Sequence, residues 1–518
     1  MAEFKTLNGY DVKDATAREN ITQLNNDFTE FKNEINQFIE QEFNDFEDKV
    51  NDELLKKATI VSSLTKLKTL TLENGYYKTN GYYAENDGGA GFYKCRAKQT
   101  SDVDNGGSII VVGNFTLELI FDNLINVKQF GARGNGTSND STFIQKAINT
   151  GFNIAFPFSR GEIYLLQNTI NITKQHQAFY GINNNHYTFV DGCIKLDVTK
   201  NITINVDAND VLFENLSFTS TNNDDRTRNC ITAENSSDIP NLDLKVKNCD
   251  FAGFNYQIYT HGRGVLVDGC TFGSTNTCIS LLYDSNSSAT ASNYYAGGRA
   301  FVITNNRFHN VETRCVEIRG GYCTGAQINN NQVDMGRRFF LCNSYVDSLE
   351  ICSNVINYCN SESINFKGSG YKKNIVISNN TFYNNNDEMK RTYPNHIIQV
   401  PAEQTGLLTN VSILNNTFRG CNENAINLRG TNMNSIQICN NNFSDIGLTN
   451  AVGCCIRFGS VRKAVIVSNI FVDGVNAKYA IRADSTGEIG SSIILCNIRQ
   501  TALMGPYEDG GHNQIQDY

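Results

Sequence analysis

Tryptophan is absent from this chain of 518 residues, and proline occurs only 5 times. Long hydrophobic runs are missing too: Ser108 to Val112 is among the longest, far short of the roughly 18 residues that span a membrane. The N-terminus shows no basic segment followed by an apolar one, which a signal peptide would need. We therefore expect neither membrane insertion nor secretion through a signal peptide.

Positive charge is also scarce. The chain has 44 Lys and Arg against 53 Asp and Glu, a net charge of −9, which argues against nucleic acid as a partner because phosphate binding needs a basic surface. The 16 cysteines form no Cys-x-x-Cys pair and no tight cluster with histidine, so no metal site and no cofactor is predicted. We interpret the cysteines as mostly reduced core residues of a protein that folds in a cytoplasm.

Heptad spacing marks residues 21–60. Apolar residues recur there in alternating steps of three and four, as in helices that pack along one seam. The seam consists of Ile21, Leu24, Phe28, Phe31, Ile35 and Phe38 and, after a change of register, Phe43, Phe46, Val50 and Leu54. Because the segment is strongly acidic, a lone helix needs partners to bury its phenylalanines. We predict a parallel coiled coil that makes the protein a homotrimer; a single amphipathic helix on its own domain is the alternative.

Two shorter segments flank this helix. Residues 1–20 contain LNGYDVKDATARENI, which resembles a segment at the start of tail proteins of phages that infect Gram-positive bacteria. That resemblance implies a virion-attachment end that binds a phage tail or baseplate protein. Residues 61–125 are rich in Gly, Tyr and alternating apolar residues, which predicts a small β leader module.

A repeat fills most of the remaining chain. Each copy has alternating apolar residues, one or two asparagines and a large apolar residue, and copies recur about every 25 residues with occasional insertions. Copies end at Phe251, Phe272, Phe308, Val333, Phe382, Phe418 and Phe443, and weaker ones at Phe218, Ile356, Ile470 and Ile498. The period is too short for a helix in each repeat, so each copy is one rung of a parallel β-helix, about 4.8 Å from the next. This all-β solenoid is predicted over residues 126–518.

The repeat explains why asparagine is so common. Two positions before the large apolar residue lie Asn306, Asn331, Asn354, Asn380, Asn416 and Asn441, with Cys249 and Cys270 at the same position in early rungs. One rung apart, these amides can donate to one another and pair turn carbonyls that would otherwise be buried without a partner. A structural ladder is therefore predicted, and these asparagines are not catalytic candidates.

The segment VKQFGARGNGTSNDSTFIQKAI, from Val127 to Ile148, resembles the pectate-lyase-like superfamily of right-handed parallel β-helices, in the branch common in phage tailspikes. The matching residues are Phe130, Gly131, Ala132, Gly134, Gly136, Asp140, Ile144, Gln145, Ala147 and Ile148. The family usually has acids where this chain has Asn135 and Asn139, which weakens any role for those acids here. The segment predicts a turn and then a short helix, with Ser141 as N-cap, that covers the open end of the β-helix.

Candidate binding and catalytic residues are expected in the columns that face outward from the solenoid. A second strand follows each large apolar residue, and its outward positions are Tyr259, Ser280, Glu317, Phe340, Asn365, Gln399, Asn427, Arg457 and Arg482; two residues on lie His261, Arg319, Lys367 and Arg429. We predict that Tyr259, His261, Arg319, Lys367 and Asn365 bind a polysaccharide. Glu312 and Glu317 are the candidate catalytic carboxylates, since glycoside hydrolysis uses two. The alternative is a set of salt bridges on a solvated face.

A second column comes directly after the large apolar residue, and consists of His309, Asp334, Asn357, Tyr383 and Arg419. Asp334 could orient His309 and raise its pKa, making the pair a catalytic general acid or base. Tyr383 and Arg419 would then bind substrate, as in a lyase that neutralises a uronate. A solvated turn column is the alternative.

Together these features predict a phage tailspike in the virion tail that binds and depolymerises a host cell-surface polysaccharide, either as a hydrolase or as a lyase. A non-enzymatic receptor-binding or structural appendage on the same scaffold is the alternative. A free polysaccharide lyase or hydrolase is a third possibility, which the coiled coil disfavours. Fold alone does not decide among them.

Overall fold

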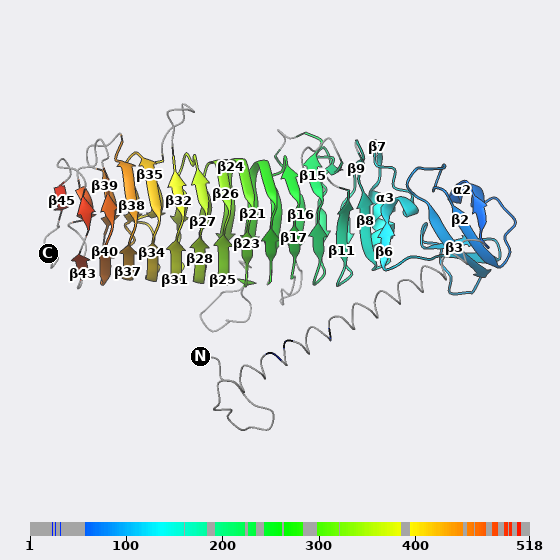
Figure 1. Ribbon diagram of the computed structural model, residues 1–518, viewed down its shortest axis with the longest axis horizontal. Helices are drawn as coiled ribbons and strands as arrows, with labels where there is room; N and C mark the ends of the chain where they lie inside the picture. The colour runs from blue at the N-terminus through cyan, green and yellow to red at the C-terminus, as the bar shows by residue number, and fades with distance from the viewer. Residues whose placement is uncertain are drawn as a thin grey trace, which may run out of the picture.

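The computed structural model shows an elongated coil of short strands, with a small separate sheet at one end and the C-terminus at the other (Figure 1). The structure describes Gln23, Asn26, Lys32 and residues 57–159, 161–183, 192–222, 226–234, 243–261, 264–282, 298–320, 322–384, 394–448, 453–459, 461–472, 479–484, 492–495, 497–499 and 505–508. The predicted attachment segment and nearly all of the predicted coiled coil lie outside these residues, as does most of the C-terminal segment.

The small sheet precedes the coil. Its strands are β1 (Thr59–Val61), β2 (Gly75–Thr79), β3 (Gly91–Ala97), β4 (Ile109–Val112) and β5 (Phe115–Leu119), in the order β1-β2-β3-β5-β4. All pairs are antiparallel except β1 with β2. A short helix, α2 (Leu64–Leu67), follows β1, and Tyr93 is fully buried in the core of the sheet.

The coil is a parallel β-helix with three faces, which confirms the fold class predicted from the repeat. Face 1 consists of β6 (Leu124–Asn126), β8 (Asn153–Pro157), β11 (Ala178–Ile182), β14 (Leu212–Glu214), β17 (Lys245–Lys247), β20 (Leu266–Asp268), β23 (Val302–Thr304), β25 (Tyr322–Asn329), β28 (Tyr345–Cys352), β31 (Lys372–Ser378), β34 (Leu408–Leu414), β37 (Met433–Cys439), β40 (Ala464–Val467) and β43 (Ser492–Leu495), with β22 (Gly298–Arg299) beside β25. All of its neighbouring strands pair in parallel.

Face 2 follows face 1 in every rung. It consists of β7 (Asn135–Asn139), β9 (Ile163–Leu166), β12 (Cys193–Leu196), β15 (Ser217–Ser220), β18 (Asp250–Ala252), the first halves of β21 (Thr271–Leu282) and β24 (Arg307–Arg319), β26 (Gln332–Gly336), β29 (Val355–Asn357), β32 (Thr381–Tyr383), β35 (Thr417–Cys421), β38 (Asn442–Ile446), β41 (Ile470–Phe471) and β44 (Ile498–Arg499). Its inward phenylalanines stack one rung apart, as between Phe418 and Phe443, whose ring centroids are 5.0 Å apart.

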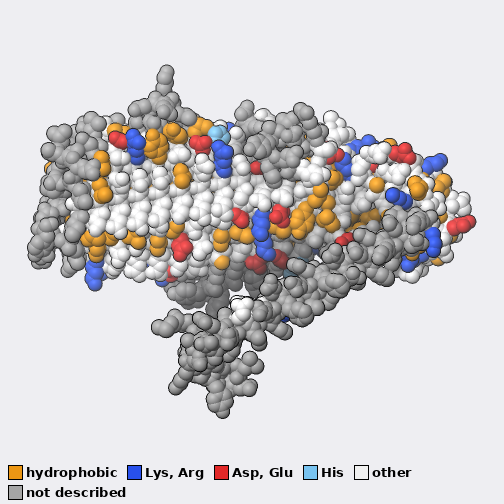
Figure 2. All heavy atoms as spheres, in the orientation of Figure 1, with side chains coloured by type: hydrophobic (Ala, Val, Ile, Leu, Met, Phe, Trp, Pro, Cys, Tyr) orange, Lys and Arg blue, Asp and Glu red, His pale blue; other side chains and the backbone are white. Residues whose placement is uncertain are grey.

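Face 3 completes the rung. It consists of β10 (Ile170–Ile172), β13 (Ile204–Val206), β16 (Ile231–Glu234), β19 (Tyr256–His261), the second halves of β21 and β24, β27 (Phe340–Cys342), β30 (Ile364–Phe366), β33 (His396–Val400), β36 (Asn424–Leu428), β39 (Cys454–Phe458), β42 (Tyr479–Ala483) and β45 (Gly505–Glu508). Figure 2 shows the result of stacking: side chains of one kind form rows along the long axis, with charged groups near the margins of a broad uncharged band.

The asparagine ladder lies in the turn between faces 1 and 2. Each Asn Nδ2 donates to the Oδ1 of the next rung, as from Asn306 to Asn331 at 3.0 Å, and each also donates to a carbonyl of the preceding rung. The ladder continues past the predicted members through Asn469 to Asn497. The residue just before a ladder asparagine takes a left-handed conformation, with φ of 58° at Asn305 and 59° at Ser353, so an asparagine at this position shapes the turn and the one after it forms the ladder.

Helix α3 (Ser141–Ile148) packs its buried Ile144 and Ile148 against the inner residues of the first rungs. Its N-cap is Asp140, one residue before the predicted Ser141. The Ser141 hydroxyl instead accepts from the backbone N–H groups of Gln167 and Asn168 in the next rung. The prediction failed because tertiary contacts compete for this hydroxyl.

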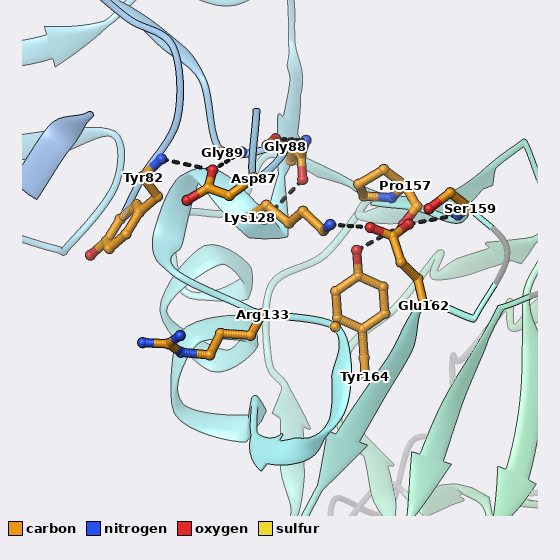
Figure 3. A network of polar contacts seen from close by, with 12 residues as sticks. Tyr82, Asp87, Gly88, Gly89, Lys128, Arg133, Pro157, Ser159, Glu162 and Tyr164 are labelled. Carbon is orange, nitrogen blue, oxygen red and sulfur yellow. Dashed lines mark hydrogen bonds and ion pairs between the residues drawn. The ribbon is translucent and has the colours of Figure 1, made fainter. Parts of the chain in front are cut away.

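Figure 3 shows the polar contacts where the small sheet meets the start of the coil. Lys128, in the 3₁₀ helix η1 (Val127–Phe130), is nearly buried and pairs with Glu162 of the coil. Arg133 lies 4.1 Å from the ring centroid of Tyr83 in the small sheet region, and the Tyr83 hydroxyl donates to the carbonyl of Gly131. Within the described residues, no helix is both long and apolar enough to cross a membrane.

Candidate functional site

The outward column of face 3 runs in register through Tyr259, Ser280, Glu317, Leu341, Asn365, Gln399, Asn427, Arg457 and Arg482. This agrees with the sequence prediction at every rung except one, where Phe340 was expected. Phe340 pairs with Val316 and is buried in the core, while Leu341 takes the outward position. Two adjacent phenylalanines show no alternation, and a slip of one residue exchanges the two faces of a strand.

Several residues of this column are buried although they face outward. Ser280 and Asn365 are fully buried and the Glu317 side chain is 1% exposed, so they do not form a solvated face. Among the described residues, Ser280 Oγ, Glu317 Oε2, Asn365 Oδ1 and Asn427 Oδ1 have no hydrogen-bond partner. A buried polar atom without a partner costs about 1–3 kcal/mol, so these four atoms need partners, such as water or a ligand, beyond the described side chains.

Glu317 is the centre of a charged and aromatic cluster. Arg314 donates to its Oε1 at 2.7 Å, and Arg319 Nε lies 3.7 Å from its Oε2. The Arg319 guanidinium also lies 4.9 Å from the ring centroid of Tyr256 and 5.4 Å from that of Tyr259. Tyr259, which lies two rungs from Glu317 and Arg319, thus belongs to the same cluster.

A further column, three residues before the outward one, was missed from the sequence. It contains Arg314, Arg338, Glu362, His396 and Asn424 on five successive rungs. Two of its members bond to the outward residue of the same rung: Arg314 donates to Glu317 at 2.7 Å, and Asn365 donates to Glu362 at 3.3 Å. The signal was present in the sequence as a constant offset of three residues, but only the folded turn shows that this position faces the same side.

Glu362 is held as an anion. Arg338 Nη2 and Ser361 Oγ donate to its carboxylate at 2.5 Å and 2.8 Å. Burial raises the pKa of Glu362, but the hydrogen bonds from Arg338 and Ser361 outweigh it and hold the pKa at about 2, against an ordinary value of 4.5. Glu362 therefore cannot supply a proton at neutral pH, and it serves to position its neighbours.

The low pKa of Glu362 predicts an acid-sensitive term in stability. Because its folded-state pKa lies below its unfolded value, the stabilisation is fully present above about pH 4.5 and is lost as the pH falls toward 2. Solvent screening of this partly exposed pair reduces the term to about 2 kcal/mol. We expect Glu362→Gln to flatten the pH dependence of unfolding over this range, while Glu350→Gln, at an exposed position on face 1, leaves it unchanged.

His396 lies one rung beyond Glu362 and is nearly buried. Burial lowers the pKa of His396, and the nearby carboxylates of Glu423 and Glu362 oppose this only in part. Its Nε2 is 3.8 Å from Glu423 Oε2, and its Nδ1 is 3.4 Å from Asn424 Nδ2. At neutral pH the ring is therefore uncharged and can accept a proton.

Glu312 lies in the turn between faces 2 and 3. It lines a hollow of about 530 Å³ together with Asn310, Arg337 and Asn360, and it forms an ion pair with Arg226. Its side chain is 54% exposed, in contrast to buried Glu317. Each of these two carboxylates thus has its own arginine partner.

The column with His309 is on face 2, not on face 3. His309 is in register with Asp334, and its Nδ1 lies 3.8 Å from Asp334 Oδ2, a distance too long for a hydrogen bond. Farther along the same column, the Arg419 guanidinium lies 5.1 Å from the ring centroid of Tyr383 and pairs with Asp445 at 2.7 Å. The two candidate sets therefore lie on different faces, separated by the turn that contains Glu312.

The remaining predicted binding residues are at the margin of face 3. Lys367 follows β30 and is exposed. His261 is the last residue of β19 and is in register with Leu282. Its side chain lies outside the described part of the structure. Among the described residues, no group of three or more His, Cys, Asp and Glu side chains is placed to hold a metal ion.

Comparison with known proteins bears on the N-terminal sheet first. Residues 60–122 match the family model described as phage tail protein small four-stranded beta-sheet domain. Four antiparallel strands, β2 to β5, lie in this range, with β1 added in parallel. The match confirms the resemblance to phage tail proteins that the sequence predicted. No curated protein matches the chain.

Solved structures with a similar shape include two phage tailspikes and one enzyme. The enzymatically active domain of bacteriophage CBA120 tailspike protein 2 is 14% identical, with a TM-score of 0.40, and the alignment covers 85% of this chain and 57% of that one. The Dettilon tailspike is 14% identical, with a TM-score of 0.46, over 74% of this chain and 68% of that one. The A-module of an Azotobacter vinelandii mannuronan C-5 epimerase is 14% identical, with a TM-score of 0.41, over 76% of this chain and 99% of that one.

Proposed function

We propose that this chain is a receptor-binding tail protein of a phage, of the tailspike type, and that face 3 binds and depolymerises a host cell-surface polysaccharide. One observation carries the proposal: the row of buried polar atoms without partners that runs through Ser280, Glu317, Asn365 and Asn427. These residues occupy four of six successive rungs, which lie about 4.8 Å apart, and such a row suits an extended polymer more than a compact ligand.

The chemistry of the row favours a carbohydrate. Glu317 Oε2, Asn365 Oδ1 and Asn427 Oδ1 need donors, whereas the buried Nε atoms of Arg314 and Arg338 need acceptors. A sugar hydroxyl can satisfy both kinds of atom, because it donates one hydrogen bond and accepts two.

Glu317 is the proposed catalytic carboxylate. Arg314 fixes its Oε1, and Oε2 would act as the base of a lyase or the nucleophile of a hydrolase once the bound substrate displaces the side chains that bury it. Glu312 and the pair of His309 and Asp334 remain the proposed partners in proton transfer. Arg319, Tyr259, Asn365, Lys367 and His261 are proposed to bind the polymer on face 3, and Tyr383 and Arg419 on face 2.

Assembly completes the proposal. The phage tail domain at residues 60–122 supports a place in the virion tail. We propose that residues 1–20 attach to a tail or baseplate protein, that residues 21–60 form the trimeric coiled coil, and that residues 61–125 and 126–518 form the leader module and the β-helix. The full-length activity, substrate and partners are part of the same proposal.

Binding without cleavage is the second candidate function. It is favoured by the ion pairs of Glu312, Glu317 and Glu362, each with an arginine, because catalysis needs one group that can donate a proton. The purified protein, incubated with capsule or wall polysaccharides, separates the two. Chain shortening with absorbance from new unsaturated ends indicates a lyase, and shortening without it a hydrolase. Tight binding with no shortening supports the second candidate; neither binding nor shortening contradicts both.

We expect Glu317→Gln to reduce depolymerisation at least about 100-fold while the polysaccharide still binds, because the amide keeps the shape of the carboxylate and loses its basicity. The matched control is Glu350→Gln on exposed face 1, which should keep full activity. The rate of product formation and the binding constant are measured for both variants. Full activity of Glu317→Gln would exclude this residue as the catalytic group.

A further inference from the structure

Three arginines converge on one aspartate near the C-terminal end of face 3. Arg429 follows β36, Arg457 lies in β39, and Arg482 lies in β42, just before Asp484. Their Nε atoms lie 3.2 Å, 2.9 Å and 3.9 Å from the Asp484 carboxylate. We call these four residues the arginine cluster.

The arginine cluster carries an excess of positive charge. Arg429 and Arg457 alone carry two positive charges, and they share the single negative charge of the Asp484 carboxylate. The side chains of Arg429 and Arg457 are 42% and 21% exposed, so the excess faces solvent. In a chain whose net charge is −9, this local reversal of sign indicates selectivity for an anion.

The terminal Nη groups of Arg457 are available to bind a ligand. Arg457 donates its Nε–H to Asp484 at 2.9 Å, and within the described residues no acceptor bonds to its two terminal Nη groups. A guanidinium presents parallel donors that match the two oxygens of a carboxylate or a phosphate. Asp484 therefore positions the arginine and leaves its outer edge open.

Asn427 provides an independent sign of a ligand. It is in register with Arg457 one rung away, its side chain is 3% exposed, and its Oδ1 has no hydrogen-bond partner in the described structure. A ligand that fits both residues carries an anionic group for Arg457 and a hydroxyl for Asn427. A sugar acid or a sugar phosphate has both.

We infer that the arginine cluster is an anion-binding subsite for charged groups of the polysaccharide, separate from the cluster around Glu317. The identity of the ligand as a glycan rests on the proposed function. Five rung steps lie between Glu317 in β24 and Arg457 in β39, which places the two clusters about 24 Å apart. A ligand that reaches both is therefore a chain of several sugars, and it carries a negative charge far from the bond that is cleaved.

Inorganic sulfate tests the subsite without any assumption about the polysaccharide. We expect titration calorimetry on the full chain to show saturable sulfate binding that Arg457→Gln weakens about tenfold or more, since one charge-assisted pair is lost. Arg462→Gln, at an exposed arginine before β40, is the matched control and should bind as the parent does. Arg457→Lys retains the charge without the planar fork and should lie between; circular dichroism checks that each variant folds.

The inference is overturned if sulfate does not saturate, or if Arg457→Gln and Arg462→Gln bind it equally. Three oligosaccharide probes then extend the test: a uronic acid hexamer, a phosphodiester-linked oligomer and a neutral glucan hexamer. Arg457→Gln should weaken binding of at least one acidic probe and not of the neutral one, and the stronger acidic probe identifies carboxylate or phosphate as the natural group. Sulfate binding without binding of any oligosaccharide or host polysaccharide would leave the anion subsite standing and contradict the proposed function.

Discussion

Replacing Asn380 by alanine lowers the free energy of unfolding by about 4 kcal/mol. The Oδ1 of Asn380 accepts from the backbone N–H and the Nδ2 of Asn354, both at 2.9 Å. Its Nδ2 donates to the carbonyl of Ile351 at 2.8 Å and to Asn416 Oδ1 at 3.0 Å. Alanine removes four hydrogen bonds at a position that is 1% exposed and leaves buried partners unpaired, each at a cost of about 1–3 kcal/mol.

Guanidinium unfolding, followed by circular dichroism, measures this loss. The control is Gln332→Ala, at an exposed polar residue on face 2, which should change the free energy of unfolding by less than about 0.5 kcal/mol. Asn380→Cys should be intermediate, because Cys249 and Cys270 occupy the same position in earlier rungs and the Sγ of Cys270 accepts a backbone N–H at 3.5 Å. If alanine and the Gln332 control unfold alike, the ladder does not stabilise the coil.

Replacing Arg314 by methionine destabilises the protein by about 3 kcal/mol, because it leaves the 1% exposed carboxylate of Glu317 without its nearest cation. Arg319 remains at 3.7 Å and keeps the loss at the lower end of the range for a broken buried pair. The free energy of unfolding of the single variant is compared with that of the parent. Arg337→Met, at an exposed arginine near the hollow, is the control and should have little effect.

A second substitution should cancel this loss. Leu341 already occupies the same outward position one rung from Glu317, and it is 2% exposed. The environment of this column thus accepts an apolar side chain. The free energy of unfolding of the double variant Arg314→Met with Glu317→Leu should therefore recover to within about 1 kcal/mol of the parent, because replacing a buried ion pair by apolar groups is commonly close to neutral. A double variant no more stable than Arg314→Met alone would show that Glu317 itself stabilises the fold.

The expected recovery of stability in the double variant bears directly on the function of Glu317. If face 3 folds as well with leucine as with Glu317, stability does not explain why a carboxylate with an unbonded Oε2 lies in the middle of a buried polar row. The same double variant should lack depolymerising activity while it binds to the same extent as a Glu317→Leu single variant. Stability and activity are thereby measured on the same protein.

The rungs and the ladder could be predicted from the sequence because a solenoid turns a linear period into a spatial column. The large apolar residues, the asparagines and the outward residues of face 3 all recur at about the same spacing, so their register follows from counting. Counting slipped by one residue in the last rungs: the copy expected to end at Ile470 ends at Phe471, which is in register with Phe443, and so the ladder residue two positions earlier is Asn469. It slipped at Phe340, where two adjacent aromatics hide the alternation.

The candidate site was only partly predictable, since the path of the turns decides which columns meet. The sequence placed Glu312 and Glu317 on one rung but could not show that the turn aims Glu312 at Arg226 and Glu317 at Arg314. The sequence also could not show that Glu362, three residues before Asn365, faces the same side of the coil as Asn365.

By itself, then, the sequence determined the parallel β-helix and most of the residues that share a column, because these depend on periodicity. The absence of tryptophan and of long apolar runs excluded other classes without indicating this one. Only the tertiary structure decided which columns are buried, which carboxylates are paired and where positive charge gathers around Asp484. Those properties depend on neighbours about 25 residues apart in the chain and one rung apart in space, and on the solvent that each rung excludes from the next.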